Sequence, residues 1–151
     1  ISTIKDLSLV VIDPVQSFVA APITTSQEAA QLYCQFCSSI ASKFNASVLS
    51  LHHMAKTALN MQEDIMNLRA SIRGSSSLVD GMRLAIAIGL ADENTVENIC
   101  AEEGLDFDRT RVVNAGVVKS NSSEVDMSPM TLIRRNAVLE VFHNKDIEWD
   151  Y

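Results

Sequence analysis

The sequence predicts an α/β fold with a mostly parallel sheet flanked by helices and an antiparallel hairpin at the C-terminal end. Two observations predict it. A strand pattern, a long helix pattern and a second strand pattern follow one another over residues 8–52, which is the order of a βαβ unit. Two later strand patterns flank a connection rich in Ser, Asn and Pro, residues 120–129, which favours antiparallel pairing. With no internal repeat and no linker, we expect one domain over residues 1–151.

The first strand and helix occupy residues 8–13 and 26–44. Residues 9–12 are leucine, valine or isoleucine, and Asp13 and Pro14 follow them. A run that is apolar on both faces is typical of a parallel strand covered by helices on each side. In residues 26–44 apolar side chains recur every three or four positions, and Ser26 is the expected N-cap. A helix with one apolar face is therefore predicted.

The second strand, residues 46–52, ends in two histidines, His52 and His53. The carboxyl ends of parallel strands meet at one edge of a sheet, and ligands bind outside that edge in open α/β folds. We therefore expect Asp13, His52 and His53 at one edge. A pair of strand-end histidines without a ligand and a zinc-binding pair are the alternative interpretations.

The remaining elements follow from shorter patterns. A polar and weakly patterned stretch is expected to be a loop, with room for one short helix, over residues 54–72. A cap of three serines precedes a short helix, and a longer helix is expected to end at Gly104. In order, the predicted elements are a helix at 78–82, a strand at 84–90, a helix at 92–103 and strands at 111–119 and 131–142.

Composition excludes several classes of protein. Twelve Lys and Arg against nineteen Asp and Glu give a net charge of −7, so any nucleic-acid contact must be local and a membrane-surface role is not expected. No apolar run approaches the length of a membrane span, and no signal peptide is visible. Three cysteines are too few for a disulfide scaffold, which predicts a cytoplasmic protein. Cys34 and Cys37 are interpreted as small apolar residues on a helix.

Three segments with a fixed order and spacing carry a family resemblance. They are HHMAK at residues 52–56, RGSSSLVDGMR at residues 73–83 and GVVKSN at residues 116–121, after the apolar strand that ends in Asp13. Together they resemble the second half of the RecA-like core of RepA-type hexameric replicative helicases, which are DnaB-related P-loop ATPases. The resemblance covers residues 7–142 and implies a partial RecA-like ATPase domain that acts in ATP-driven DNA unwinding.

The resemblance implies a role for several residues. Asp13 corresponds to the Walker B acid that acts on Mg²⁺, and His53 to the polar sensor of the ATP γ-phosphate. Arg83 corresponds to the arginine finger, which in a ring of identical subunits reaches the nucleotide of the neighbour. Lys119 is expected to assist it. If strand alternation persists, the side chain of His52 points away from that of His53.

The same resemblance places residues 54–72 at the central channel of the ring, where single-stranded DNA passes. Lys56 and Arg69 are the basic residues that would contact its phosphates. No aromatic residue lies between Lys56 and Arg73, so stacking on bases is not expected.

One expected feature is missing from the sequence. None of the five glycines belongs to a G-x-x-x-x-G-K-[ST] loop, whose backbone N–H groups cradle phosphates. The family carries this loop, with its strand and helix, upstream of the position that matches Ile1. We therefore expect the chain to be a piece of something longer, to be inactive as an ATPase alone, and to self-associate through apolar surface that the missing part would cover.

Two alternatives remain. A copy without the phosphate loop could act as a non-catalytic module that joins a ring through Arg83 and its subunit face. The segment LVVIDPVQ, residues 9–16, also resembles the opening strand of isochorismatase-like cysteine hydrolases. That resemblance would make Asp13 the acid, Lys56 the lysine and Cys100 the nucleophile, although the glycine-rich approach to the cysteine is absent.

Overall fold

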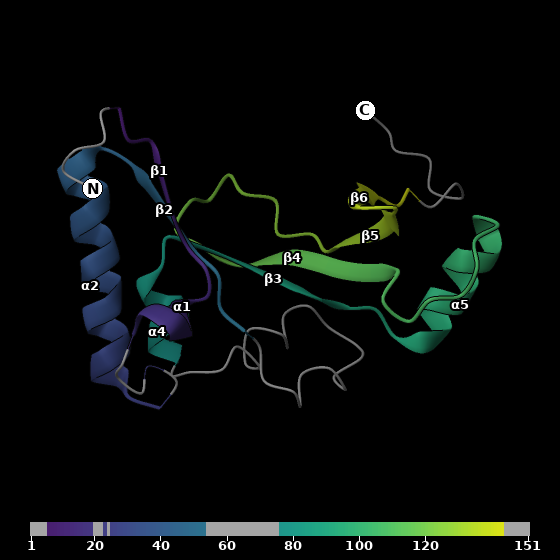
Figure 1. Cartoon of the computed structure of the whole chain (residues 1–151), viewed down its shortest axis with the longest axis horizontal. Helices are drawn as coiled ribbons and strands as arrows, with labels where there is room; N and C mark the ends of the chain where they lie inside the picture. The colour runs from purple at the N-terminus through teal and green to yellow at the C-terminus, as the bar shows by residue number, and fades with distance from the viewer. Residues whose placement is uncertain (1–5, 20–22, 24, 54–75, 144–151) are drawn as a thin grey trace. The chain divides into compact units, whose positions relative to one another are not determined.

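The computed structural model describes residues 6–19, 23, 25–53 and 76–143. Contacts group the chain into two compact units (Figure 1). Unit 1 comprises residues 1–58 and 70–83, and unit 2 comprises residues 59–69 and 84–151. The expectation of one domain over residues 1–151 stays a prediction.

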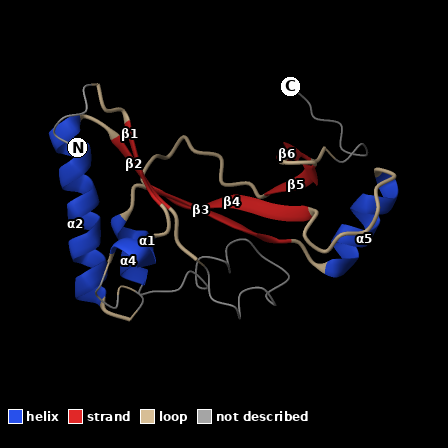
Figure 2. Cartoon of the chain, viewed as in Figure 1, coloured by secondary structure: helices blue, strands red, loops and turns tan. Residues whose placement is uncertain are grey.

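Unit 1 contains the predicted βαβ arrangement (Figure 2). Its strands pair in parallel, with Leu9 opposite Ser47 and Ile12 opposite Ser50. The α/β class and the parallel pairing of the first two strands are therefore confirmed. In chain order the elements are β1 (Leu9–Ile12), α1 (Val15–Phe18), α2 (Gln27–Phe44), β2 (Ser47–Ser50) and α4 (Ser76–Gly81).

Helix α2 has the ends that the sequence predicts. The Ser26 hydroxyl oxygen accepts a hydrogen bond from the Ala29 N–H at 3.2 Å, which satisfies one of the unpaired donors of the first turn. The C-cap is Asn45, which has a φ of 50°, a left-handed conformation that asparagine tolerates better than most residues.

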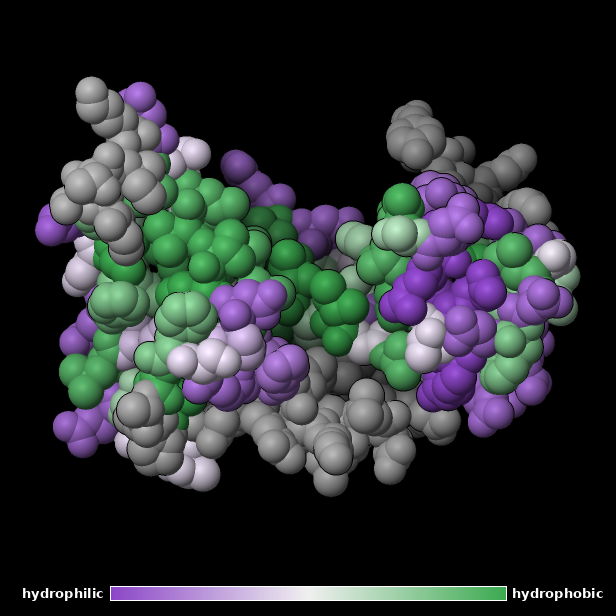
Figure 3. Space-filling model, viewed as in Figure 1, coloured by the Kyte–Doolittle hydropathy of each residue, from purple (hydrophilic) through white to green (hydrophobic). Residues whose placement is uncertain are grey.

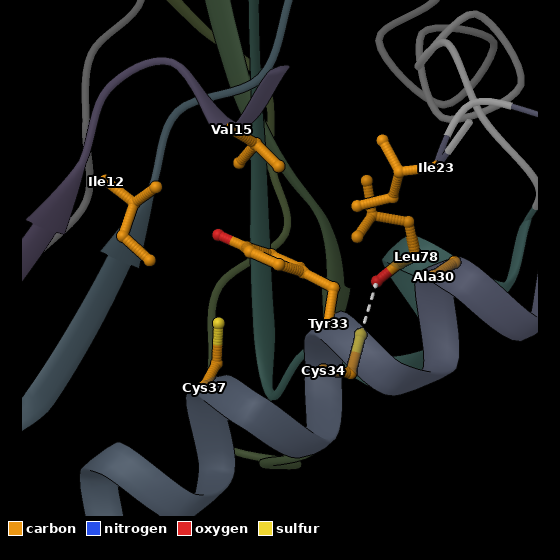
Figure 4. Packing of buried hydrophobic residues seen from close by; sticks show 8 residues of the cluster. All are labelled: Ile12, Val15, Ile23, Ala30, Tyr33, Cys34, Cys37 and Leu78. Atoms are coloured by element: carbon orange, nitrogen blue, oxygen red, sulfur yellow. Dashed lines mark hydrogen bonds between the residues drawn. The ribbon is translucent and has the colours of Figure 1, made fainter. Parts of the chain in front are cut away.

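The core of unit 1 lies between α2, α4 and the segment around β1 (Figure 4). The Tyr33 ring lies among aliphatic and cysteine side chains, and the Cys34 thiol faces the Leu78 carbonyl oxygen at 3.7 Å. Burial of both Cys34 and Cys37 agrees with their interpretation as small apolar residues. The buried cluster is Ile12, Val15, Ile23, Ala30, Tyr33, Cys34, Cys37 and Leu78.

The expected mostly parallel sheet, apolar on both faces, is seen only in part. Among the described residues the parallel strands are β1 and β2 alone. Val10 and Ile12 belong to or pack on the core, whereas Leu9 and Val11 are 51% and 52% exposed. Because side chains alternate along a strand, the face of β1 with Val10 and Ile12 packs on the core, and the face with Leu9 and Val11 is about half exposed.

The described residues of unit 2 form an antiparallel sheet and the helix α5. The strand order is β3-β4-β5-β6, and each neighbouring pair is antiparallel. The expected antiparallel C-terminal strands are thus confirmed, but β3 joins them instead of extending the parallel pair. The elements are β3 (Leu84–Leu90), α5 (Glu93–Glu102), β4 (Val112–Ser120), β5 (Met130–Arg135) and β6 (Val138–Val141).

The single strand predicted over residues 131–142 is wrong, because this stretch folds as the hairpin of β5 and β6. Arg135 pairs with Val138 across a turn in which Asn136 has a φ of 57°. A two-residue turn with positive φ matches the twist of a hairpin, and asparagine favours it.

Helix α5 ends before Gly104 as predicted, begins at an N-cap, Asp92, that was not predicted, and covers the second core. The Asp92 carboxylate accepts the Thr95 N–H at 2.9 Å, and Gly104 has a φ of 63° just beyond the helix. Cys100 packs among apolar side chains of the helix and sheet. No helix in the described ranges has the length and apolar character needed to cross a membrane.

Candidate functional site

The candidate site is the edge where β1 and β2 end, called here the strand-end edge, and it consists of Asp13, Gln16, His52 and His53. Asp13 follows β1 and the two histidines follow β2 after Leu51. Since β1 and β2 are parallel and in register, these residues leave the sheet at the same edge. This placement agrees with the sequence prediction, while the chemical roles stay predictions.

Two backbone hydrogen bonds tie together the segments that follow the strands. The Leu51 N–H donates to the Ile12 carbonyl oxygen at 2.9 Å, and the Val15 N–H donates to the Leu51 carbonyl oxygen at 2.8 Å. The Val15 side chain is 1% exposed and anchors the short helix α1 in the core. The backbone at the strand-end edge is therefore held from both sides.

The polar side chains of the edge differ in their surroundings. Asp13 and His53 are exposed, whereas His52 is partly buried. The side-chain amide nitrogen of Gln16 lies 2.8 Å from Nδ1 of His52. The sequence prediction missed Gln16, because its importance depends on a contact 36 positions further along the chain and no local pattern marks it.

A buried polar contact supports the end of β2. The Tyr33 hydroxyl lies 2.7 Å from the Ser50 hydroxyl, and the Cys37 thiol lies 4.0 Å from the same oxygen. Burial raises the pKa of Tyr33 to about 12, so the phenol is neutral at physiological pH. Ser50 is the last residue of β2, and α2 therefore holds the strand end from which His52 and His53 continue.

An apolar groove of about 640 Å³ lies beside the same elements. It is formed by β1, by Phe18 and Val19, and by residues of α2 that include Leu32 and Phe36. Figure 3 shows the apolar surface of unit 1 in green. The groove contains none of Asp13, His52 and His53, so its lining suits an apolar segment and not a phosphate.

The other predicted site residues lie elsewhere. Arg83 is exposed at the end of unit 1, directly before β3. Lys119 lies on β4 in unit 2, and its Nζ donates to Oδ1 of Asn121 at 2.8 Å. Lys56 and Arg69, the predicted DNA contacts, fall outside the described residues, and so does the start of the RGSS segment.

The metal ligands that the strand-end edge could provide are the carboxylate of Asp13 and the imidazoles of His52 and His53. Within the described ranges, no group of three or more His, Cys, Asp or Glu side chains could hold a metal ion, whereas zinc sites usually use three or four protein ligands. Mg²⁺ bound with a nucleotide needs only one or two carboxylates, since phosphates and water complete its shell. At the strand-end edge Asp13 is the residue that carries a carboxylate, and it is exposed.

The surroundings of Cys100 do not favour a nucleophile. Its side chain is 2% exposed and lies in the core of unit 2 with Val96, Val112 and Ile133. A catalytic thiol must reach its substrate and is activated in polar, partly exposed surroundings.

The strand-end edge combines a carboxylate that can order a divalent cation with imidazoles that can donate to anionic oxygens. Both kinds of group leave parallel strands at the place where open α/β folds bind ligands. A comparison of the chain with family models and with curated proteins finds no match.

Proposed function

We propose that this chain supplies part of the ATP site of a RepA-like, DnaB-related replicative DNA helicase. The observation that supports the proposal best is the exit of Asp13 and of His52 and His53 from two parallel strands at one edge. A RecA-like fold is proposed with it, because β1, α2 and β2 form the βαβ unit that such a domain requires. The HHMAK, RGSSSLVDGMR and GVVKSN segments provide the second line of support.

At the strand-end edge, the Asp13 carboxylate would hold Mg²⁺, either directly or through a water molecule bound to the ion. When bound, the ion neutralises charge on the nucleotide phosphates. His53 would donate a hydrogen bond from its ring to the γ-phosphate and lose that bond after hydrolysis. Both side chains are exposed, as the recognition of a nucleotide in solution requires.

Arg83 is proposed to act on the nucleotide of a neighbouring subunit in a ring, with Lys119 assisting. Its exposure at the end of unit 1 suits a side chain that reaches outside its own molecule. A guanidinium stabilises the negative charge that develops on transferred phosphate. Lys56 and Arg69 would contact the backbone of single-stranded DNA in the ring channel.

The decisive test starts from the gene. The proposal predicts a G-x-x-x-x-G-K-[ST] loop encoded upstream of Ile1, because the 151 residues contain none. In the protein extended to include this loop, we expect DNA-stimulated ATP hydrolysis and strand separation. Asp13→Asn and His53→Ala should each lower kcat by about 100-fold or more, and Arg83→Ala by about 1000-fold. Asp106→Asn, at an exposed position, is the matched control.

Mixing two inactive variants tests the action of Arg83 between subunits. In a ring that contains both Asp13→Asn and Arg83→Ala subunits, an intact Asp13 of one subunit can face an intact Arg83 of the next. ATPase activity should therefore rise in the mixture well above the reduced activity of either variant alone. Upstream sequence without a phosphate loop, or full ATPase activity in the Asp13→Asn protein, would refute the helicase proposal.

A non-catalytic ring module is the second candidate. The exposed Arg83, on a chain without a phosphate loop, favours it. In that case, the 151-residue chain added to active rings should inhibit them at stoichiometric amounts, and its Arg83→Ala variant should inhibit less.

A further inference from the structure

We infer that Gln16 is a positioning residue that makes His52 a hydrogen-bond donor at Nε2. The Gln16 side-chain amide nitrogen lies 2.8 Å from Nδ1 of His52. This inference rests on the proposed function, because it adds a second imidazole to the strand-end edge. It specifies which ligand groups that imidazole can bind.

The chemistry of the two groups determines the position of the ring proton. A side-chain NH₂ group can only donate hydrogen bonds, so the Nδ1 that faces it must accept. A neutral imidazole has one donor nitrogen and one acceptor nitrogen. With Nδ1 as the acceptor, Nε2 carries the proton. An N–H at Nε2 suits phosphate oxygens, which are acceptors, and does not suit a ligand group that can only donate.

The backbone keeps the two partners together. Gln16 follows Val15, whose N–H is bonded to Leu51, and His52 follows Leu51 directly. The side-chain bond therefore lies beside a backbone bond between the same two segments. One of these segments carries Asp13 and the other carries His53. Gln16 thereby joins the acid-bearing segment to the histidine-bearing segment through the ring whose proton it positions.

The opposite orientation of the amide makes a different prediction. If the Gln16 Oε1 faced the ring, Nδ1 would donate and the proton would sit on Nδ1. Nitrogen chemical shifts separate these two tautomers, because an imidazole nitrogen that bears a proton resonates far from one that does not. The measurement needs neither a nucleotide nor ATPase activity.

The experiment is a long-range ¹H–¹⁵N correlation spectrum of the labelled 151-residue chain at about pH 9, above the usual titration range of imidazoles. His53→Gln and His143→Gln assign the signals of the three histidines. In the wild type we expect the His52 proton on Nε2 alone. Gln16→Glu should move it to Nδ1, because a carboxylate only accepts, and the control Gln31→Glu, at an exposed position of α2, should leave it unchanged.

A wild-type proton on Nδ1, or a His52 spectrum that does not change in Gln16→Glu, would overturn the inference and leave the helicase proposal standing. Gln16→Ala is the second variant. In it, the share of His52 that carries its proton on Nε2 should fall, and retention of the pure wild-type tautomer would also count against a role for Gln16. Failure of the ATPase test would overturn the helicase proposal without changing these spectra.

Discussion

Replacing Gly81 by alanine tests how closely α4 packs against α2. A Cβ added at position 81 would lie 2.4 Å from Sγ of Cys34 and 2.9 Å from its Cβ. Non-bonded heavy atoms prefer about 3.5–4.0 Å. The Cys34 side chain is buried, and its thiol is bonded to the Leu78 carbonyl oxygen. The new methyl group must therefore push α4 away from α2 by about 1 Å.

The direction in which Gly81→Ala changes the free energy of unfolding shows whether the contact with Cys34 matters. Gly→Ala in a helix without such a contact stabilises a protein by about 0.4–1 kcal/mol. Overpacking a close contact costs about 1–3 kcal/mol. Gly81 is not among the described residues with positive φ, so its backbone does not require glycine. We expect Gly81→Ala to lower the free energy of unfolding by about 1–2 kcal/mol.

A double-mutant cycle with Cys34→Ala provides the assay. Urea unfolding, followed by far-UV circular dichroism, gives the free energy of unfolding of the wild type, both single variants and the double variant. Without the sulfur atom at position 34 the closest contact is gone and the contact with the Cβ of residue 34 remains. Gly81→Ala should therefore destabilise the Cys34→Ala protein less than the wild type, with a coupling of about 1 kcal/mol.

Gly104→Ala is the control, because φ is 63° there and no atom lies within 4 Å of an added Cβ. Its cost should be about 1 kcal/mol from backbone strain alone and independent of Cys34. A stabilising Gly81→Ala, or the same cost in both Cys34 backgrounds, would refute the packing account.

Four further predictions concern the cores, the helix cap and the surface. Burial raises the pKa of Tyr33 from 10.0 to about 12, so stability that is complete below pH 10 should fall as the pH rises toward 12. Tyr33→Phe should lower the free energy of unfolding by about 1 kcal/mol at neutral pH, and its urea midpoint should not fall above pH 10. If the midpoints of the variant and of the wild type fell equally at alkaline pH, this account would be wrong. Hydrogen bonds from Thr95 lower the pKa of Asp92, so its contribution is present above the usual carboxyl pKa and is lost on acidification below it. Asp92→Ala should lower the free energy of unfolding by about 1 kcal/mol at neutral pH and should reduce the decrease of the urea midpoint on acidification. Asp92→Asn should keep most of the stability that the cap provides. An unchanged decrease on acidification in Asp92→Ala would contradict this role of Asp92. Cys100, 2% exposed, should react with iodoacetamide far more slowly in the native chain than in urea, and fast native alkylation would revive the hydrolase alternative. Phe36, 54% exposed beside the apolar groove, should promote self-association at high concentration, so Phe36→Glu should lower the mass measured by light scattering; equal masses would exclude this surface.

Local signals in the sequence were sufficient for the two long helices, α2 and α5, whereas the short helix α1 was not predicted. Ser26 and Asp92 accept N–H groups three residues ahead, and Asn45 and Gly104 take the left-handed conformations that end a helix. Each of these interactions lies within about one turn of chain, so the residues that determine it are adjacent in the sequence.

The edge that carries Asp13, His52 and His53 could also be predicted, for a reason of topology. Two strands joined by a helix run parallel, and their carboxyl ends then coincide. The register of β1 and β2 has this arrangement. The position of these three residues at one edge thus followed from the order of the elements. That order did not reveal the contacts that their side chains make.

Tertiary structure alone decided the pairing of the later strands. The apolar pattern of β3 is compatible with parallel or antiparallel neighbours, and only contact with β4 makes it antiparallel. Residues 131–142 read as one strand because both arms of the hairpin carry strand-forming residues, and the turn at Asn136 interrupts them.

The bonds between Gln16 and His52 and between Tyr33 and Ser50 were equally invisible in the sequence. Capping and helix periodicity act between residues a few positions apart, so composition and spacing encode them. These two hydrogen bonds join residues 36 and 17 positions apart, and a contact of that kind exists only once the chain has brought its distant segments together.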